Sequence, residues 1–291
     1  MIKKMFLAVI ALGTFATSCS NDDDNTSTNA NLTLNLDQGK TLSALGADFV
    51  YEGWIIVDGS PVSTGTFTSV DFPQTFSVNA NQLSDATRFV LSIEPANDLD
   101  PAPAATKVLV GDFSGNTAAV NTGVVGDFSN ASGAFFLRTP TDETGMNNGN
   151  DQNGVWFGTP GAPPTPNFVL PTLSAGWAYE GWVVGESGPI STGIFTDFDS
   201  RDNTNGFSGT QNNAGPPVPG EDFFLSAPAG ETFPLDVRGK KVVISVEPVP
   251  DNSPAPYVLK PLVGTAGQET APATHSFDQN PTSLTSGIVT R

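Results

Sequence analysis

The sequence contains the stretch Tyr51-Glu52-Gly53-Trp54, followed after a short turn by Pro61-Val62-Ser63-Thr64-Gly65-Thr66-Phe67. The same pattern returns 128 residues later as Tyr179-Glu180-Gly181-Trp182 and Pro189-Ile190-Ser191-Thr192-Gly193-Ile194-Phe195. A strand, a turn and a second strand built around a large aromatic residue occur twice. This pattern predicts two similar domains in tandem.

A second block of sequence recurs at a different spacing. Ser92-Ile93-Glu94-Pro95 is matched by Ser245-Val246-Glu247-Pro248, which lies 153 residues later. The second copy therefore holds 25 additional residues, which we expect in a surface loop over about residues 199–220. Long loops often carry binding specificity, so this segment and the polar loop 145–153 are the predicted contact regions.

The composition predicts an all-β chain. Glycine (30 residues) and proline (24 residues) are abundant, and charged residues make up only 14%. Leu32-Thr33-Leu34-Asn35-Leu36 alternates as a half-buried strand does, whereas 49–57 is apolar on both faces apart from Glu52 and predicts a central strand. We find no helical pattern after residue 19 and expect two Ig-like β-sandwich repeats.

These patterns also predict domain boundaries. The first repeat is expected to span residues 32–140, a polar connection residues 141–153, and the second repeat residues 154–291. We expect residues 133–138 to form the last strand of the first repeat and residues 287–291 to be its counterpart in the second. The C-terminus is therefore expected to be a strand of the second repeat.

Residues 1–19 have the features of a bacterial lipoprotein signal. Lys3 and Lys4 form a basic start, a short apolar run follows over residues 5–12, and small residues lead to Cys19, the only cysteine. The apolar run is too short for a permanent membrane-spanning helix. We expect Cys19 to be lipidated and to attach the chain to a membrane. The alternative, a free buried cysteine in a cytosolic protein, fits neither its position nor its context.

Residues 20–31 are expected to form a flexible acidic tether. Ser20-Asn21-Asp22-Asp23-Asp24 is at least a solvated spacer. It also looks like the export signal that some Gram-negative bacteria use to place lipoproteins on the outer face. We therefore expect an outer membrane lipoprotein at the cell surface, with the periplasmic face as the alternative.

The charge balance argues against a nucleic-acid partner. The chain has 30 acidic residues and 12 basic ones, and removal of the signal would take away Lys3 and Lys4 but no acid. Such a negative field repels nucleic acid and anionic lipid headgroups.

The order of the repeated motifs resembles the extracytoplasmic domain of anti-sigma-K factors. Tyr-x-x-Trp, Pro-x-Ser-x-Gly-x-Phe, Ser-x-Glu-Pro, Pro-x-Pro and Leu-x-Gly follow one another over about residues 40–112 and again over about residues 168–265. The resemblance implies a β-sandwich outside the membrane. In that family one transmembrane helix joins this domain to a cytoplasmic sigma-binding domain. We find no pattern for either of these parts, so no contact with a sigma factor is expected.

Trp54 and Trp182 are expected to be core residues rather than surfaces on which sugars stack. Each lies in the most apolar strand of its repeat, and burial of an indole of about 150–250 Å² contributes roughly 4–6 kcal/mol. Trp156 and Trp177 are likewise expected to pack in a core or between the repeats.

Glu52 and Glu180 are unusual because they lie within apolar strands. Each must reach a sheet edge or accept hydrogen bonds from a neighbouring loop. With Glu94 or Glu247 they could act as general acid and base, but two intact copies without a nearby nucleophile or metal set indicate a structural role. No catalytic residue is predicted. The predicted structural motif consists of Tyr51, Glu52, Trp54, Glu94, Pro95, Tyr179, Glu180, Trp182, Glu247 and Pro248.

Two oxygen-rich segments, Asn97-Asp98-Leu99-Asp100 and Asp251-Asn252-Ser253, follow the Glu-Pro corners. They could hold Ca²⁺, but their spacing matches no complete ligand loop, and Asx turns explain them more simply. His275, the single histidine, has no Cys or other His with which to form a zinc site or a catalytic triad. No cofactor or metal is therefore expected.

The sequence thus predicts a non-enzymatic envelope lipoprotein that acts in binding or sensing, with an unidentified protein or glycan as its ligand. The alternatives are a structural or adhesive surface module and a hydrolase that uses the acidic residues. A binding protein should have a pocket lined by loops, and a spacer should have none. A hydrolase should have two carboxylates that converge across an open cleft.

Overall fold

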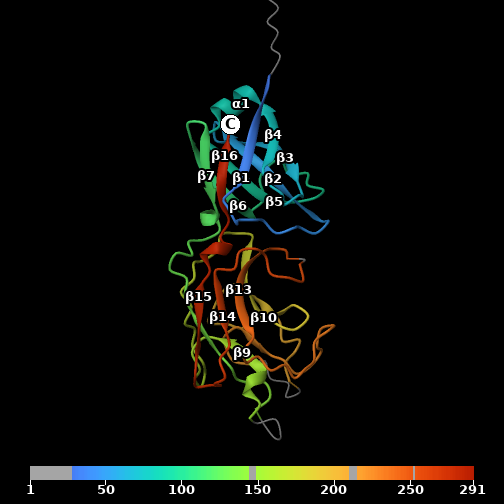
Figure 1. Cartoon of the computed structure of the whole chain (residues 1–291), viewed down its shortest axis with the longest axis vertical. Coiled ribbons are helices and arrows are strands. Elements are labelled where there is room, and N and C mark those ends of the chain that lie inside the picture. The colour runs from blue at the N-terminus through green and yellow to red at the C-terminus, as the bar shows by residue number, and fades with distance from the viewer. Residues whose placement is uncertain (1–27, 144–148, 210–214, 252) are drawn as a thin grey trace, which may run out of the picture.

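The computed structural model describes residues 28–143, 149–209, 215–251 and 253–291. The expected signal segment, Cys19 and the expected tether up to residue 27 lie outside these residues. Almost all of the regular structure is β, in two eight-stranded antiparallel sheets that lie one above the other in Figure 1. The expectation of an all-β chain is confirmed.

The first sheet curls around its own core, because the strands at its two ends, β3 and β4, contact each other. In spatial order it contains β3 (Ser60–Phe67), β2 (Phe49–Val57), β5 (Arg88–Pro95), β6 (Lys107–Ser114), β7 (Thr117–Asn121), β16 (Ser286–Thr290), β1 (Asn29–Leu36) and β4 (Gln74–Asn79).

The second sheet curls in the same way, with contacts between its end strands β11 and β12. Its spatial order is β11 (Pro189–Phe195), β10 (Trp177–Val184), β13 (Lys241–Pro248), β14 (Leu262–Thr265), β15 (His275–Gln279), β8 (Ala134–Phe136), β9 (Gly154–Phe157) and β12 (Gly220–Asp222).

One short α-helix, α1 (Ala80–Asp85), was not expected from the sequence. It begins where the Asn79 side chain accepts hydrogen bonds from the backbone N–H groups of Asn81 and Gln82, which caps its first turn. Among the described residues, the remaining helical turns are 3₁₀ segments of three residues each at Thr122–Val124, Asp151–Asn153 and Pro281–Ser283. No helix among the described residues has the length and apolar character needed to cross a bilayer.

The doubled motif forms a hairpin beside a central strand, as predicted. β2 pairs with β3 on one side and with β5 on the other. β10 has the same relation to β11 and β13. The pairing is shifted by a bulge directly after Gly53 and after Gly181. A Cβ at Gly53 would lie 2.4 Å from Thr64 Oγ1, so the close approach at this bulge requires glycine in the motif.

Two strands lie in the opposite sheet from the one expected. β8, from the segment 133–138, pairs with β15 and β9 in the second sheet. The C-terminal strand β16 lies between β7 and β1 in the first sheet, where Figure 1 shows it among strands from the start of the chain. The assignment of these two strands from the sequence is wrong, and the boundaries 32–140 and 154–291 do not coincide with the two sheets.

The connections at the junction explain this exchange. Residues 122–133 follow β7, and after the 3₁₀ turn at Thr122–Val124 the remaining nine residues could reach up to about 30 Å toward the other sheet if extended. Residues 280–285 lead back from β15 to β16 through a 3₁₀ turn. The Lys40 side chain fixes this return by donating hydrogen bonds to the carbonyls of Pro281 and Thr282.

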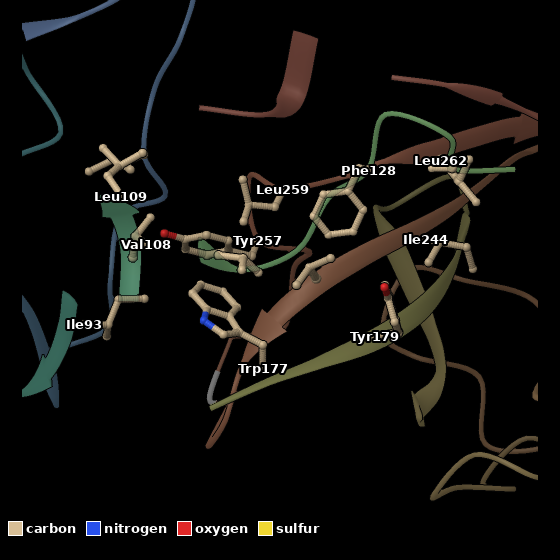
Figure 2. Packing of buried hydrophobic residues seen from close by; sticks show 14 of the residues in the cluster. Ile93, Val108, Leu109, Phe128, Trp177, Tyr179, Ile244, Tyr257, Leu259 and Leu262 are labelled. Carbon is tan, nitrogen blue, oxygen red and sulfur yellow. The ribbon is translucent and has the colours of Figure 1, made fainter. Parts of the chain in front are cut away.

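One hydrophobic core runs through both sheets. Figure 2 shows Trp177 of β10 and Tyr257 of the connection between β13 and β14 approaching Ile93 and Val108 of the first sheet. The Trp177 and Tyr257 rings lie 5.7 Å apart, and the Tyr257 hydroxyl lies 3.0 Å from the Tyr51 hydroxyl. The two sheets therefore share both apolar packing and a buried hydrogen bond.

Candidate functional site

A chain of hydrogen bonds joins the tryptophan of the first motif to a glutamate in the next strand. Trp54 Nε1 donates to Ser92 Oγ at 2.8 Å, and Ser92 Oγ donates to Glu94 Oε1. The backbone N–H of Ala104 also donates to Glu94 Oε1, at 2.8 Å. All three side chains are buried. The chain therefore satisfies an indole, a hydroxyl and a carboxylate oxygen in the interior.

The second sheet contains the same chain of hydrogen bonds. Trp182 Nε1 donates to Ser245 Oγ at 2.7 Å, and Ser245 Oγ donates to Glu247 Oε1. The backbone N–H of Tyr257 lies 2.9 and 3.0 Å from the two Glu247 carboxylate oxygens. Trp182 is 2% exposed, so the tryptophans of the motif are core residues, as expected.

The in-strand glutamates have serine partners on the neighbouring strand. Ser63 Oγ donates to Glu52 Oε1, and Ser191 Oγ donates to Glu180 Oε1. The expected hydrogen bonds to these glutamates are present, although the donor lies on the paired strand and not on a loop. The serine of Pro-x-Ser-x-Gly-x-Phe therefore donates a hydrogen bond to the glutamate of Tyr-Glu-Gly-Trp in both copies of the motif.

The tyrosine of each motif donates a hydrogen bond to the backbone of the segment that precedes its strand. The Tyr51 hydroxyl donates to the Ser43 carbonyl at 2.8 Å, and the Tyr179 hydroxyl donates to the Pro171 carbonyl at 2.6 Å. Each partner lies eight residues before its tyrosine. Burial raises the pKa of both phenols well above the usual range, so they remain protonated donors at neutral pH.

Three carboxyl groups gather in the second sheet at Glu180, Glu247 and Asp251. One oxygen from each lies within 4.8 Å of the others. Glu180 is 4% and Glu247 1% exposed, whereas Asp251 is partly exposed. Burial raises the pKa of Glu180 to about 8, partly offset by the Ser191 hydrogen bond and reinforced by the other two carboxylates. Burial likewise raises the pKa of Glu247 to about 7, against the Ser245 hydrogen bond.

The corresponding acids of the first sheet, Glu52, Glu94 and Asp98, are arranged more loosely. Glu52 is only partly buried, and these three do not meet within the distance that unites the second set. Burial raises the pKa of Glu94, with smaller contributions of the same sign from Glu52 and Asp98. The two halves thus share residue types but differ in how tightly the acids converge.

A cavity of about 370 Å³ lies where loops of the two sheets meet. Residues 43–46 and 104–106 line it from the side of the first sheet, and residues 247–251 and 255–257 line it from the side of the second. Its wall is mainly apolar, with the carboxyl groups of Glu247 and Asp251 as its acidic part. Both prolines of the predicted motif, at positions 95 and 248, line it as well.

The loop 199–220 is packed against the second sheet over its described residues, so the expectation that it is free of packing is wrong. Asp202 accepts a hydrogen bond from Gly220 N at 2.8 Å. The Phe207 ring lies 5.4 Å from the ring of Phe233. The additional residues of the second repeat do not all lie in this loop, because residues 223–240 after β12 form a second long connection. Residues 210–214 lie outside the described part.

The second predicted contact loop, 145–153, is also partly anchored. Asp151 accepts a hydrogen bond from the backbone N–H of Thr139 at 3.2 Å, and Asn153, directly before β9, is 6% exposed. Residues 145–148 are not among the described residues. His275 uses both ring nitrogens for backbone contacts, to Gly267 N and the Glu269 carbonyl.

The packed loop covers an acidic cluster that the sequence analysis missed. Asp222 accepts hydrogen bonds from Thr141 N at 2.8 Å and from Trp156 Nε1 at 2.8 Å. Glu221 accepts from Ser208 Oγ at 2.5 Å. Both acids are fully buried, and burial raises the pKa of each to about 7. Glu221 and Asp222 belong to the three-residue strand β12, which follows a glycine- and proline-rich stretch and is too short to give a periodic signal of burial.

Because Glu221 holds its proton to a higher pH when folded than when unfolded, it should make stability decline with rising pH. The unfolded state gives up this proton near pH 4, whereas the folded state keeps it to about pH 7. Between these values the free energy of unfolding should fall by on the order of 3 kcal/mol through this group. Glu221→Gln keeps an acceptor for Ser208 and should flatten the profile by this amount. Parallel pH profiles of chemical unfolding for the two proteins would contradict this prediction.

Comparisons with family models, curated proteins and solved structures found no match to this chain. The similarity to anti-sigma-K extracytoplasmic domains therefore rests on the sequence motifs alone.

Proposed function

We propose that this chain is a lipid-anchored envelope protein that binds a small, largely apolar ligand in the cavity between its two sheets. The cavity is the observation that carries the proposal. Its volume of about 370 Å³ is within the usual range of ligand sites, and loops from both sheets line it. Its carboxyl groups, Glu247 and Asp251, would disfavour an anionic ligand and accept an uncharged or cationic one.

The location in the envelope is part of the same proposal. The basic start, the apolar run and the small residues before Cys19 support lipidation at this cysteine and a place on the outer membrane. Cell-surface display is the preferred location because of the acidic run after Cys19, and the periplasmic face is the alternative.

We further propose that the two halves are copies of one sandwich-type β-domain similar to the extracytoplasmic domain of anti-sigma-K factors. Two observations support this. The Trp–Ser–Glu hydrogen bonds occur at corresponding positions in β2–β5 and β10–β13, and strand order follows the same pattern in both sheets. The resemblance favours a sensing role, and we propose no contact with a sigma factor.

The cavity also bears on the two alternative functions. A surface spacer needs no such cavity. A hydrolase needs carboxylates on an open cleft, whereas Glu180 and Glu247 are buried and hydrogen-bonded to serines. A protein or glycan partner at the outer loops stays a prediction from the sequence.

Binding of three naphthyl probes to the full chain tests the proposed cavity ligand. Neutral naphthylethanol and cationic naphthylethylammonium should give heat in isothermal titration calorimetry, and anionic naphthylacetate should bind much more weakly. Ala105→Trp, which introduces an indole at a residue that lines the cavity, should weaken binding of the neutral probe at least about tenfold, or 1.4 kcal/mol. Ala119→Trp on the exposed face of β7 is the matched control. No heat with any probe, or equal binding to the Ala105→Trp protein, would reject the cavity as the site.

A further inference from the structure

We propose that Glu180, Glu247 and Asp251 bind one divalent cation of the size of Ca²⁺. The proposal concerns the acidic wall of the cavity and does not depend on the organic ligand proposed above. Carboxylate oxygens are the ligands that hard divalent cations prefer. The three residues come from β10, from the end of β13 and from the loop that follows it, so the fold brings them together from separate parts of the sequence.

The spacing of the oxygens suits Ca²⁺. Oxygens bound at about 2.3–2.6 Å from one ion lie at most about 5 Å apart, when they are on opposite sides of it. The three carboxyl groups each offer an oxygen within 4.8 Å of the other two. Mg²⁺ demands a near-ideal octahedron and gives up its water reluctantly, whereas Ca²⁺ accepts several carboxylate oxygens in a flexible geometry, so a set of three protein carboxyl groups favours Ca²⁺.

A second observation that points to a ligand is the unsatisfied oxygen of Glu180. Ser191 Oγ donates a hydrogen bond to Glu180 Oε1. Glu180 Oε2 is buried and accepts no hydrogen bond from the described residues. The side chain is 4% exposed, so bulk water is a poor substitute. A buried carboxylate oxygen without a partner is costly, and a shared cation would remove this cost.

The surroundings supply access but little positive charge. Glu247 and Asp251 line the cavity, which gives an ion and its remaining water ligands a route to the cluster. Lys260 is the basic group whose charge acts on Glu247. The ion pairs found among the described residues, Arg88–Asp112, Arg138–Glu143 and Arg238–Asp236, involve none of the three acids.

The first sheet supplies a built-in control. Asp98 occupies the position that corresponds to Asp251, but Glu52, Glu94 and Asp98 do not converge to the same degree. A general effect of Ca²⁺ on an acidic protein would act on both halves. A specific site should depend on the second set only.

Calorimetric titration of the full chain with CaCl₂ alone, without any organic probe, tests the site. We expect one bound ion per chain, weaker binding of MgCl₂, and a melting temperature that Ca²⁺ raises and a chelator lowers. Asp251→Asn should weaken Ca²⁺ at least about tenfold. Asn keeps the acceptor for Ser253 N, so this variant is expected to fold. Asp98→Asn should leave the affinity unchanged.

Several outcomes would overturn the proposal. The first is that millimolar Ca²⁺ gives the wild-type protein no heat and no change in melting temperature. The second is that Asp251→Asn keeps the wild-type affinity for Ca²⁺. The third is that Asp98→Asn loses as much Ca²⁺ affinity as Asp251→Asn. Naphthyl probes that bind while Ca²⁺ does not would reject the cation site and keep the proposed cavity ligand. Binding of Ca²⁺ without binding of any naphthyl probe would reject the proposed cavity ligand and keep the cation site.

Discussion

A chain that ends at Thr285 is expected to lose amide protection in β1 and β7, more than 160 residues away from the deleted segment. The deletion removes β16, which pairs with β7 on one side and β1 on the other, and removes Val289 from the core. It also removes Arg291, whose guanidinium donates to the Leu83 and Ala86 carbonyls. We expect a loss on the order of 5 kcal/mol, comparable to the entire stability of many domains. Hydrogen exchange resolved by peptide measures it.

The location of the damage distinguishes the observed strand exchange from the arrangement expected from the sequence. If β16 lay in the second sheet in the place of β8, its neighbours β9 and β15 would lose protection instead, which would contradict the prediction. A synthetic peptide of residues 285–291 added to the shortened chain should restore protection in β1 and β7. As a matched pair, Val289→Ser should destabilise the protein far more than Ile288→Ser, because Val289 is buried and Ile288 is 48% exposed.

Most strands could be predicted from the sequence because each carries its own pattern. The alternation of residues 32–36 puts Leu32 and Leu34 on one face, and both are fully buried in β1. The run over 49–57 is apolar on both faces, and in β2 both Ile55 on the core face and Trp54 on the opposite face are buried. The helix α1 could not be predicted, because six residues make too few turns to show a helical period in the sequence.

The sheet to which a strand belongs is not a local property. β8 and β16 are both short strands with buried apolar residues, and either would fit beside an antiparallel neighbour. The sheet that each of these strands joins depends on where the preceding connection leads and on the close approach of the two sheets. Neither of these can be read from the strands themselves, so the exchange of the two strands could not be predicted.

The candidate site was predictable in its residues but not in its geometry. Glu180 was recognised as an unusual acid in an apolar strand, and Ser245 lies directly opposite it in the pairing of β10 with β13. Ser245 and Glu247 are two residues apart on a strand, so period two puts them on one face. The approach of Asp251 depends on the path of the loop after Pro248. The cavity depends on the contact between the two sheets, which the sequence patterns do not determine.

Trp182→Ala is expected to lower the free energy of unfolding by about 3–5 kcal/mol, the usual result of removing a fully buried aromatic side chain. The side chain is 2% exposed, and its indole N–H is the donor to Ser245 that begins the buried chain of hydrogen bonds. Trp182→Phe keeps most of the ring but removes the donor, and should cost less, about 1–3 kcal/mol. Chemical unfolding of both variants measures these values.

Trp54→Ala provides the matched comparison in the first sheet. Trp54 is 3% exposed and donates to Ser92 in the same way, so its loss should be of similar size. Because the two sheets share one hydrophobic core, either substitution should lower the stability of the whole chain in one transition. If Trp182→Ala left stability unchanged but abolished binding of a glycan, the indole would be a recognition surface and its structural role would be rejected.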